Sequence, residues 1–437
     1  MDFPPPLRLR TSASSGLAGS VEVPGDKSIS HRAVILAAMA NGTSRISGLC
    51  EGLDVGRTLE AVQALGARVE AGGPGEWLVS GCSWRSPVGP IDCGNSGTAA
   101  RLLMGAIAGR AIRATLTGDQ SLSRRSMERV AGPLRLMGAD VTGGDHLPLT
   151  VQGGRLGPLA FVNATGSAQV KSAVLLAGVG ATGPVEITEP LPSRDHTERM
   201  LGCFGIDVQI SDVGTGTRIA LGQERSLRAV NLEVPGDPSA AAFPLVAALI
   251  TPGSEVTVRG VLVNPLRTGI YLTLQEMGAD LVFTNRRMVG GEPVADITAR
   301  SSALRGVTIP IQRVPAMIDE YPVLAMAAAT ALGETSMLGL GELRHKESDR
   351  LAAIAAGLEA CGIAAEIRGD DLIVSGARPR GGQVQSRGDH RIAMSFLTLG
   401  LASTAPMVVD GSDMIATSFP GFDELMRGIG ARISTDS

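Results

Sequence analysis

Residues 21–33 read VEVPGDKSISHRA, and residues 232–244 read LEVPGDPSAAAFP. The tetrapeptide VPGD therefore occurs twice, and its glycines, Gly25 and Gly236, stand 211 positions apart. Lys27 follows the first copy, whereas Pro238 follows the second. A segment that recurs at such a distance indicates that the whole chain is built from repeats, and internal repeats decide a fold before any local pattern does.

A glycine that ends a helix-like segment and precedes a short strand-like segment recurs six times. The preceding segments, such as DVGRTLEAVQAL and DRLAAIAAGLEA, have helical periodicity. Glycine suits the left-handed conformation in which many helices end. The six residues are Gly66, Gly138, Gly205, Gly278, Gly362 and Gly430.

A second series of six lies between these glycines, where polar residues open a helix of small apolar residues. A turn and a β-like stretch follow each helix. The openings begin at Lys27, Asn95, Ser167, Asp237, Asp319 and Asp389. The chain therefore reads as six repeats of roughly 70 residues, each with the order strand, helix, strands, helix, strand.

Three repeats separate the two VPGD copies, so each copy opens one half of the molecule. The pattern predicts two domains of three repeats, with the chain passing between them only twice, near residues 22 and 236. One domain is residues 23–236, and the other is 1–22 plus 237–437. The N-terminal strand in LRLRTSAS then belongs with the second half.

Composition excludes several classes of function. A net charge of −4 and 3% aromatic residues argue against a nucleic-acid surface. Five scattered cysteines without a CxxC pair indicate a reducing compartment, no disulfide framework and no zinc site. The apolar runs are too short for a membrane span, which needs about 20 residues. The N-terminal MDFPPPLRLR has no apolar signal-peptide core. We expect a cytoplasmic protein with neither nucleic-acid nor membrane partners.

Lysine is rare in this chain. Of the 39 basic residues only Lys27, Lys171 and Lys346 are Lys, and the others are Arg. Genomic codon bias accounts for the excess of Arg. The three exceptions are candidates for positions that need a compact ammonium rather than a guanidinium.

The helix openings are candidate anion sites, because a helix N-terminus presents free N–H groups and partial positive charge. For Asp237 we favour simple capping, because its neighbours offer no cation. The other openings carry more than a cap requires, and cations also gather in the loops 121–130, 191–199, 266–269 and 344–350. No phosphate-binding loop of the GxxxxGK[ST] type and no GxSxG elbow occurs. The sequence therefore favours a site that binds anions and in which Asp, Glu and Lys carry out acid–base chemistry.

Seven segments in order, GDKSISHRA, GNSGTAAR, SAQVKSAVLLAG, RDHTE, IDEYPVLA, KESDRL and DHRIAMSF, resemble the 5-enolpyruvylshikimate-3-phosphate synthase family, and several resemble its bacterial class II branch. The resemblance covers nearly the whole chain. It implies an α/β fold of two similar domains, each of three βαββαβ units in an inside-out α/β barrel, with the active site in the interdomain cleft.

The resemblance also implies a reaction. Members transfer the enolpyruvyl group of phosphoenolpyruvate to the 5-hydroxyl of shikimate 3-phosphate, with release of phosphate, in the shikimate pathway to chorismate and aromatic amino acids. No metal or cofactor is needed, and we expect a monomer. By motif match, the catalytic residues are Asp319, Lys346 and Glu347. Shikimate 3-phosphate is expected at Lys27, Ser28, Arg32, Ser167, Ala168, Gln169, Arg194, Asp319 and Lys346. Phosphoenolpyruvate is expected at Lys27, Gly97, Arg125, Gln169, Arg350 and Arg391.

Two positions depart from the class II pattern. Ser126 follows Arg125 where relatives often have Pro, which leaves open whether Arg124 or Arg125 contacts substrate. Gly97 stands where some class II members have Ala. In this family glyphosate occupies the phosphoenolpyruvate site, and a glycine here favours sensitivity to it, because an added methyl would intrude on the longer inhibitor.

Three alternatives remain. The UDP-N-acetylglucosamine enolpyruvyl transferase shares the sixfold fold but usually has a loop cysteine, which GDQSLSRRSMER lacks. An RNA-end cyclase on related repeats would need basic, aromatic RNA surfaces, which the composition disfavours. A non-catalytic anion-binding protein would have no need of Asp319 and Lys346 together.

Overall fold

The computed structural model describes residues 7–436, so most of the MDFPPPLRLR segment, residues 1–6, lies outside the described residues. The chain divides into two compact units. Unit 1 consists of Met1–Pro24 in its described part, Pro235–Met288 and Pro293–Ser437, and unit 2 consists of Gly25–Val234 and Val289–Glu292. Among the described residues, no helix has the length and apolar character needed to span a bilayer.

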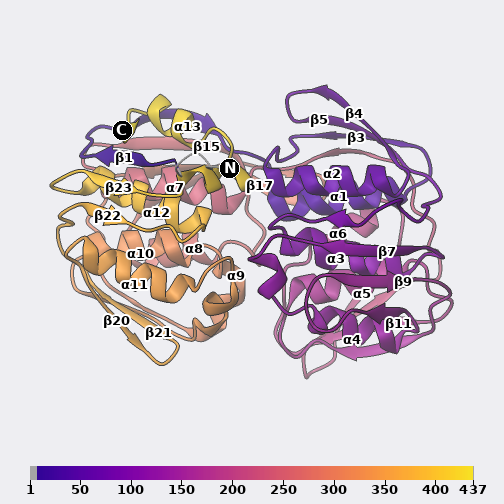
Figure 1. The fold of residues 1–437 in the computed structure, drawn as a ribbon. Helices are drawn as coiled ribbons and strands as arrows, with labels where there is room; N and C mark the ends of the chain where they lie inside the picture. Colours follow the sequence, from indigo (N-terminus) through magenta and orange to yellow (C-terminus); the bar gives the residue numbers. More distant parts are fainter. Residues whose placement is uncertain (1–6, 437) are drawn as a thin grey trace, which may run out of the picture. The chain divides into compact units, whose positions relative to one another are not determined.

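Six four-stranded sheets repeat one topology, three in each unit (Figure 1). In each sheet two neighbouring strands are parallel, and two further strands continue the sheet in antiparallel order, as in β10-β11-β13-β12. A parallel pair needs a crossover connection, which a helix provides. In five of these sheets a short loop joins the last two antiparallel strands, and in the sixth these strands are β1 and β24. The predicted α/β class and the sixfold repeat are confirmed.

Unit 2 contains the elements from α1 to β14 in unbroken chain order. Its strands are β3 (Thr43–Ser47), β4 (Arg68–Gly73), β5 (Glu76–Ser80), β6 (Ile91–Asp92), β7 (Arg113–Thr117), β8 (Asp140–Thr142), β9 (Leu149–Gln152), β10 (Leu159–Val162), β11 (Val185–Glu189), β12 (Val208–Asp212), β13 (Thr217–Leu221) and β14 (Asn231–Glu233). Its helices are α1 (Lys27–Met39), α2 (Leu53–Ala64), α3 (Gly97–Ala108), α4 (Glu128–Leu136), α5 (Ala168–Gly178) and α6 (His196–Cys203).

Unit 1 combines the two N-terminal strands with the C-terminal half. Its strands are β1 (Leu9–Ser12), β2 (Ala18–Glu22), β15 (Glu255–Leu262), β16 (Asp280–Val289), β17 (Glu292–Arg300), β18 (Thr308–Ile309), β19 (Glu334–Met337), β20 (Ala364–Arg368), β21 (Asp371–Ser375), β22 (Gly382–Val384), β23 (Met407–Val409) and β24 (Arg432–Thr435). Its helices are α7 (Pro238–Ile250), α8 (Gly269–Glu276), α9 (Val314–Met317), α10 (Tyr321–Thr330), α11 (Arg350–Ala360), α12 (His390–Leu399) and α13 (Phe422–Gly428).

Three inner helices form the core of each unit. Every residue of α7 and of α12 is buried, and so are nearly all residues of α10. In unit 2 the helices α1, α3 and α5 have the same character. A helix that is apolar on all sides must be covered on all sides. The outer helices and the sheets supply that cover around the inner three (Figure 1).

Both sequence series mark helix ends as predicted. The six glycines of the first series follow α2, α4, α6, α8, α11 and α13, and each has a positive φ, between 76° and 112°. The second series marks the starts of α1, α3, α5, α7, α10 and α12. At five of these starts a side-chain oxygen of Asp26, Ser96, Ser167, Asp237 or Asp389 caps a backbone N–H.

The predicted order of elements within a repeat was wrong. Each repeat reads strand, helix, strand, helix, strand, strand, as in β6-α3-β7-α4-β8-β9. The hairpin follows the second helix, because the left-handed glycine that ends this helix turns the chain directly into the first hairpin strand. The family's βαββαβ order, as we expected it, placed two strands between the helices.

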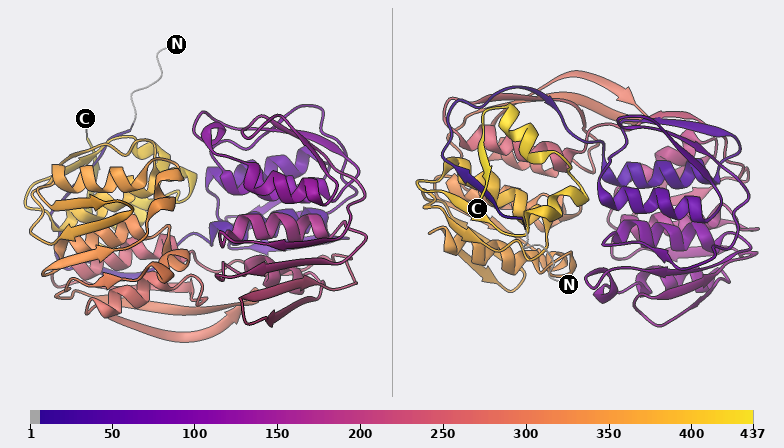
Figure 2. Two further views of the ribbon diagram at one scale, coloured as in Figure 1. Left: turned by 90° about the horizontal axis from the view of Figure 1, so that it is seen from below. Right: turned by 45° about the horizontal axis from the view of Figure 1, so that its top comes forward.

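The number of chain passages between the units was also wrong. Besides the passages at Pro24–Gly25 and Val234–Pro235, the turn Val289–Glu292 groups with unit 2 while the strands around it group with unit 1. The cause is the length of the β16–β17 hairpin, whose strands have 10 and 9 residues (Figure 2). Periodicity identifies a hairpin but not where its turn packs.

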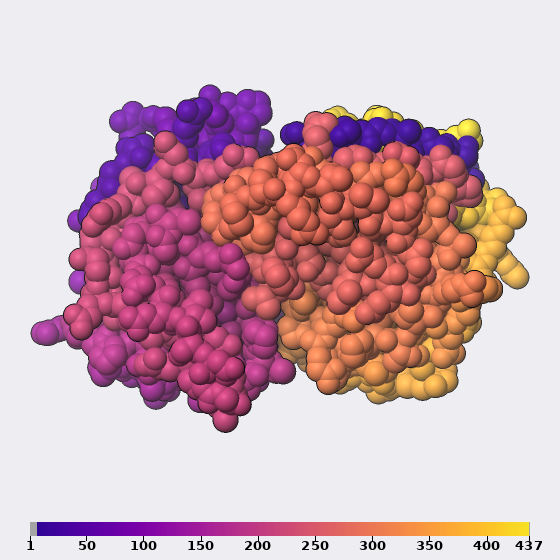
Figure 3. Space-filling view, turned by 180° about the vertical axis from the view of Figure 1, so that it is seen from behind, coloured from indigo at the N-terminus to yellow at the C-terminus, as the bar shows by residue number. Residues whose placement is uncertain are grey.

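The N-terminal strand lies where the repeat requires it. Strand β1 pairs with both β23 and β24, and Leu9 faces Val409 on one side and Thr435 on the other. Strand β2 is parallel to β15. Figure 3 shows the N-terminal residues in indigo against the orange and yellow residues of unit 1. Strand β1, from the LRLRTSAS segment, is therefore a strand of a sheet whose other members come from the C-terminal part of the chain.

Candidate active site

The opening of α1 presents an ammonium held by a carboxylate. Lys27 is the first residue of α1, and its Nζ lies 2.9 Å from Asp54 Oδ2 in the first turn of α2. Both side chains keep some exposure, 14% and 11%. Asp26 caps the helix by accepting a bond from the N–H of Ile29, at 2.8 Å. The positive end of α1 and the Lys27 ammonium therefore act at the same place.

Arg32, one turn further along α1, is buried and bonded to protein acceptors. Its Nε donates to Thr197 Oγ1 and its Nη2 to Ser172 Oγ, both at 2.7 Å, and its Nη1 donates to the carbonyl of Ser28 at 2.8 Å. Arg32 thereby ties the starts of α1, α5 and α6 together. The half-buried Ser28 is part of this arrangement.

His31 lies beside these cations. Burial, followed by the charges of Lys27 and Arg32, lowers the pKa of His31 well below its usual value. Its Nδ1 is 2.7 Å from Thr58 Oγ1. A buried imidazole that bonds to a neighbouring hydroxyl is a structural residue of this opening.

The opening of α3 brings two arginines to Gly97. Arg125 Nη2 donates to Asn95 Oδ1 at 2.8 Å. Arg101 Nη1 donates to Gln169 Oε1 at 2.9 Å. A β-carbon added to Gly97 would lie 2.7 Å from Arg101 Nη1 and 3.4 Å from Arg125 Nη1. Arg124, by contrast, is exposed. Of the two loop arginines, Arg125 therefore packs at this opening.

The opening of α5 carries three candidate residues, Ser167, Ala168 and Gln169, all half-buried. Ser167 is the N-cap, and its Oγ accepts from the N–H of Val170 at 3.5 Å. Gln169 Nε2 donates to Thr98 Oγ1 at 2.9 Å, which links this opening to that of α3. Arg194 lies half-buried in the loop between β11 and α6. Unit 2 therefore contains the openings of three helices that side chains connect to one another.

Unit 1 brings Asp319 and Lys346 together. Lys346 Nζ lies 3.4 Å from Asp319 Oδ1, and the two residues precede the two helices of one repeat, α10 and α11. Their side chains are 28% and 16% exposed. Arg391, in the first turn of α12, donates from Nη1 to the carbonyl oxygen of Asp319 at 3.2 Å. A carboxylate and an ammonium at this distance and exposure can pass protons to a bound molecule.

Arg350 organises the carboxylates around this pair. Its Nη1 lies 3.3 Å from Asp319 Oδ1, its Nη2 lies 2.5 Å from Glu347 Oε2, and its Nε lies 2.7 Å from Asp389 Oδ2. Burial opposes the charge of this guanidinium, but Asp389, Glu347 and Asp319 outweigh burial and raise the pKa of Arg350 above its usual value. Arg350 is therefore a fixed cation that holds Asp319 and Glu347 in place.

Sequence reasoning missed the role of three carboxylates as partners of basic residues in these clusters, and named Asp389 only as a helix opening. Asp54, Asp389 and Glu189 each bind a predicted basic residue: Lys27, Arg350 and Lys171. The only available signal was that a buried cation needs a partner. The partner's identity depends on tertiary contacts, because the members of each pair stand 18 to 39 positions apart.

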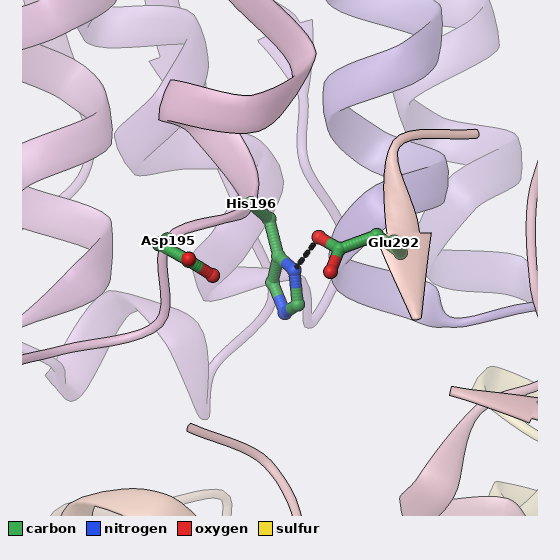
Figure 4. A group of neighbouring side chains, drawn as sticks. All are labelled: Asp195, His196 and Glu292. Atoms are coloured by element: carbon green, nitrogen blue, oxygen red, sulfur yellow. Dashed lines mark hydrogen bonds and ion pairs between the residues drawn. The ribbon is translucent and has the colours of Figure 1, made fainter. Parts of the chain in front are cut away.

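One further cluster was not expected. His196 Nδ1 lies 2.7 Å from Glu292 Oε1 in the β16–β17 turn, and both side chains are fully buried (Figure 4). Arg199 Nε lies 2.8 Å from Asp195 Oδ2 and 3.6 Å from Glu292 Oε2. Ligand atoms of the two carboxylates and the imidazole come within 4.8 Å of one another, as in metal sites. The Arg199 guanidinium supplies the cation here, so the cluster serves to fix the turn to the start of α6.

The fold and these openings define an enolpyruvyl transferase scaffold. The enolpyruvyl transferase NikO from Streptomyces tendae has the same fold, with a TM-score of 0.78 over 99% of this chain and all of that chain, at 19% identity. EPSP synthase from Acinetobacter baumannii is more similar, with a TM-score of 0.87 and 41% identity over 99% of this chain and all of that chain.

The sequence relatives are closer still. The 3-phosphoshikimate 1-carboxyvinyltransferases of Caulobacter vibrioides and Phenylobacterium zucineum are 55% and 54% identical. The matches cover 98% of both chains in the first comparison, and 97% of this chain and 95% of the relative in the second. The family model for EPSP synthase (3-phosphoshikimate 1-carboxyvinyltransferase) matches residues 11–426. The chain belongs to the EPSP synthase family.

Proposed function

We propose that this protein transfers the enolpyruvyl group of phosphoenolpyruvate to the 5-hydroxyl of shikimate 3-phosphate and releases phosphate, as a 3-phosphoshikimate 1-carboxyvinyltransferase of the shikimate pathway. Family membership over nearly the full chain supports the reaction class. The observation that carries the chemistry is the 3.4 Å contact of Lys346 Nζ with Asp319 Oδ1 beside two fixed arginines, Arg350 and Arg391.

The first step is an addition. Asp319 accepts the proton of the 5-hydroxyl as its oxygen attacks C2 of the enol, and a proton is delivered to C3 from Lys346 or Glu347. A new O–C2 bond forms, and C3 becomes a methyl group. Positive character develops at C2 during this step, and the carboxylates held around Arg350 stabilise it.

The second step is an elimination. The C2–O bond to phosphate breaks, a proton leaves C3, and the enol double bond forms again. Lys346 assists the departing phosphate because an ammonium can donate a proton or a hydrogen bond to it. Proton removal and donation by one pair of groups, in opposite directions in the two steps, explains why a carboxylate and an ammonium stand together.

The two substrates each carry a phosphate and a carboxylate, so their site needs several cations and helix N-termini. We assign shikimate 3-phosphate to Lys27, Ser28, Arg32, Ser167, Ala168, Gln169 and Arg194, in addition to Asp319 and Lys346. We assign phosphoenolpyruvate to Lys27, Gly97, Arg125, Gln169, Arg350 and Arg391. The side-chain links among the openings of α1, α3 and α5 support a common site in unit 2.

We further propose that residues 23–236 and residues 1–22 with 237–437 act as two domains, because the assignments take residues of both for one reaction. The protein works as a monomer in the cytoplasm.

Small-angle scattering with saturating shikimate 3-phosphate should show a smaller radius of gyration than the free protein. We expect this decrease because the two domains should close on the bound ligand. An unchanged radius of gyration at confirmed saturation would contradict this domain closure.

Phosphate release from phosphoenolpyruvate tests the function directly. We expect release only when shikimate 3-phosphate is present, and none when UDP-N-acetylglucosamine replaces it. Asp319→Asn should lower kcat by about 100-fold to 10,000-fold, the usual contribution of a general base. Glu366→Gln is the matched control, because Glu366 is an exposed carboxylate of unit 1 paired with Arg368. Release with UDP-N-acetylglucosamine alone would overturn the proposal.

A further inference from the structure

Lys171 is one of the largest fully buried side chains in the protein, and the proposed reaction makes no use of it. It lies on the second turn of α5, and its ammonium has three acceptors. Nζ is 2.8 Å from Glu189 Oε2, 2.7 Å from Glu198 Oε1 and 3.2 Å from the carbonyl oxygen of Ser193. Three acceptors match the three N–H bonds of an ammonium.

The acceptors surround one loop. Glu189 is the last residue of β11, Ser193 lies in the loop, and Glu198 is in the first turn of α6. The half-buried Arg194 lies in this loop, directly after Ser193. One buried nitrogen therefore fixes the loop at its beginning, its middle and its end.

A second set of bonds extends the network to the α5 opening. Glu189 Oε1 accepts from Asn163 Nδ2 at 2.6 Å and from Ser193 Oγ at 2.7 Å. Asn163 Nδ2 also donates to the carbonyl oxygen of Ser167 at 3.0 Å, and Asn163 Oδ1 accepts from the N–H of Ser167 at 3.4 Å. Ser167, the N-cap of α5, and the Arg194 loop are thus held through one carboxylate.

The charges make this network depend on an ammonium. Burial opposes the charge of Lys171, but Glu198 and Glu189 outweigh burial and raise its pKa, so the side chain stays protonated. Two carboxylates buried at one place repel each other unless a cation lies between them. A guanidinium could not replace this ammonium, because its planar fork spreads the donors over three nitrogens.

We propose that Lys171 is a positioning residue for the phosphate group of shikimate 3-phosphate: through Glu189, Glu198 and the Ser193 carbonyl it sets the place of Arg194 relative to the α5 N-terminus. This inference rests on the proposed function, which assigns that substrate to Ser167 and Arg194. Lys171 itself touches no substrate.

The test compares two affinities in one variant. Calorimetry of the full-length protein with shikimate 3-phosphate alone should show that Lys171→Met weakens binding by about tenfold to 100-fold, the range typical when a group that orients a ligand-binding side chain is lost. The KM for phosphoenolpyruvate, at saturating shikimate 3-phosphate, should change less than about twofold. Arg218→Met is the control, because Arg218 lies on β13, beside the strand β11 that ends at Glu189, and pairs with Glu186 outside the network.

A double variant covers the case in which Lys171→Met does not fold. Lys171→Met with Glu198→Gln keeps the formal charge of the network at its natural value, since one positive and one negative charge are removed together. It leaves the Ser193 carbonyl without its ammonium donor, so weak binding of shikimate 3-phosphate should persist in a folded protein, as judged by circular dichroism.

Three results would contradict the positioning role of Lys171. Natural affinity in the double variant would show that Lys171 acts through charge alone and would overturn the positioning role. An equal loss for both substrates would show a general structural role and would overturn it too. Failure of the natural protein to bind shikimate 3-phosphate would refute the proposed function, and this inference with it.

Discussion

The openings of α1 and α7 share the sequence VPGD, which ends at the N-cap residues Asp26 and Asp237. They differ from the next residue onward, which is Lys27 in α1 and Pro238 in α7. Both begin with an aspartate cap: Asp26 accepts from the N–H of Ile29 at 2.8 Å, and Asp237 accepts from the N–H of Ser239 at 2.7 Å. At α1 the next residue is Lys27, which keeps 14% exposure and pairs with Asp54.

At α7 the opening is sealed. Pro238 takes the place of the lysine, and a buried Arg267 lies 3.3 Å from Asp237 Oδ1 and 3.7 Å from Glu320 Oε1. Arg267 also donates to Ser239 Oγ at 3.0 Å. The capped helix start is thus a scaffold that the repeat supplies, whereas the residue after the cap decides whether the opening offers a cation to a ligand or closes on itself.

The largest effect should come from breaking the first opening. Lys27→Met should lower kcat/KM by about 100-fold to 1,000-fold, because an ammonium aimed at developing negative charge contributes on this scale. Lys27→Arg should also cost activity heavily, since a planar guanidinium does not reproduce a point charge. Steady-state kinetics with both substrates measures this effect.

The reciprocal change at α7 is the control. Pro238→Lys should bring no gain in activity, because this position is buried. Near-natural turnover of both Lys27 variants would contradict the division between an open and a sealed start.

A substitution at the α7 opening should lower the free energy of unfolding rather than the catalytic rate. Arg267→Met leaves Asp237 and Glu320 buried without their cation, and breaking a buried pair in this way costs about 3–5 kcal/mol. Denaturant unfolding measures the loss. The control Arg300→Met removes a pair with Glu255 that is 42% and 59% exposed, which should cost about 1 kcal/mol at most. Similar losses in the two variants would show that Arg267 is not a structural cation.

The comparison of the α1 and α7 openings also shows which features could be predicted from the sequence. The helix starts and the left-handed glycines are set by neighbours within a few residues, so Asp26, Asp237 and Gly66 could be interpreted from local pattern alone. Arg267 could not, because its partner Asp237 stands 30 positions away. We expected the loop that contains it to bind a ligand, and burial shows that Arg267 serves the fold.

The same distinction holds for the candidate site. Family motifs predicted Asp319 and Lys346, and the structure brings them to 3.4 Å. The network around Lys171 and the carboxylate of Asp389 were missed, because periodicity gives the face of a helix and not the identity of the side chain that packs on it. The position of the 289–292 turn escaped prediction for the same reason.

The two VPGD glycines, Gly25 and Gly236, also differ in the space around them. A β-carbon on Gly25 would lie 1.9 Å from the carbonyl oxygen of Gly48, whereas one on Gly236 would lie 3.1 Å from that of Gly260. We expect Gly25→Ala to destabilise the protein by about 3 kcal/mol and Gly236→Ala by about 1 kcal/mol, the upper and lower ends of the cost of overpacking. Thermal unfolding of both variants tests the difference, and equal losses would contradict it.

The smallest effect is expected at the α3 opening. The methyl of Gly97→Ala meets the flexible end of Arg101, which can move aside, so the KM for phosphoenolpyruvate should rise only a few-fold, roughly 1 kcal/mol. Inhibition by glyphosate should weaken more, because the longer inhibitor has less room. Gly56→Ala is the matched control, since no atom lies within 4 Å of its β-carbon position. A variant no more tolerant than the natural protein would exclude Gly97 as the determinant.

The pairing of β1 with the last strand has a consequence for biosynthesis. Unit 2 is almost one continuous stretch, Gly25–Val234, and can assemble as soon as that stretch leaves the ribosome. Leu9 must wait for Thr435, which at about 5–20 residues per second takes on the order of 20 to 80 seconds. Until β23 and β24 are made, β1 is an unpaired strand open to association with other chains, whereas β2 waits only for β15. All residues of unit 2 are therefore available once Glu292 is made, whereas unit 1 cannot be closed until β24 can pair with β1.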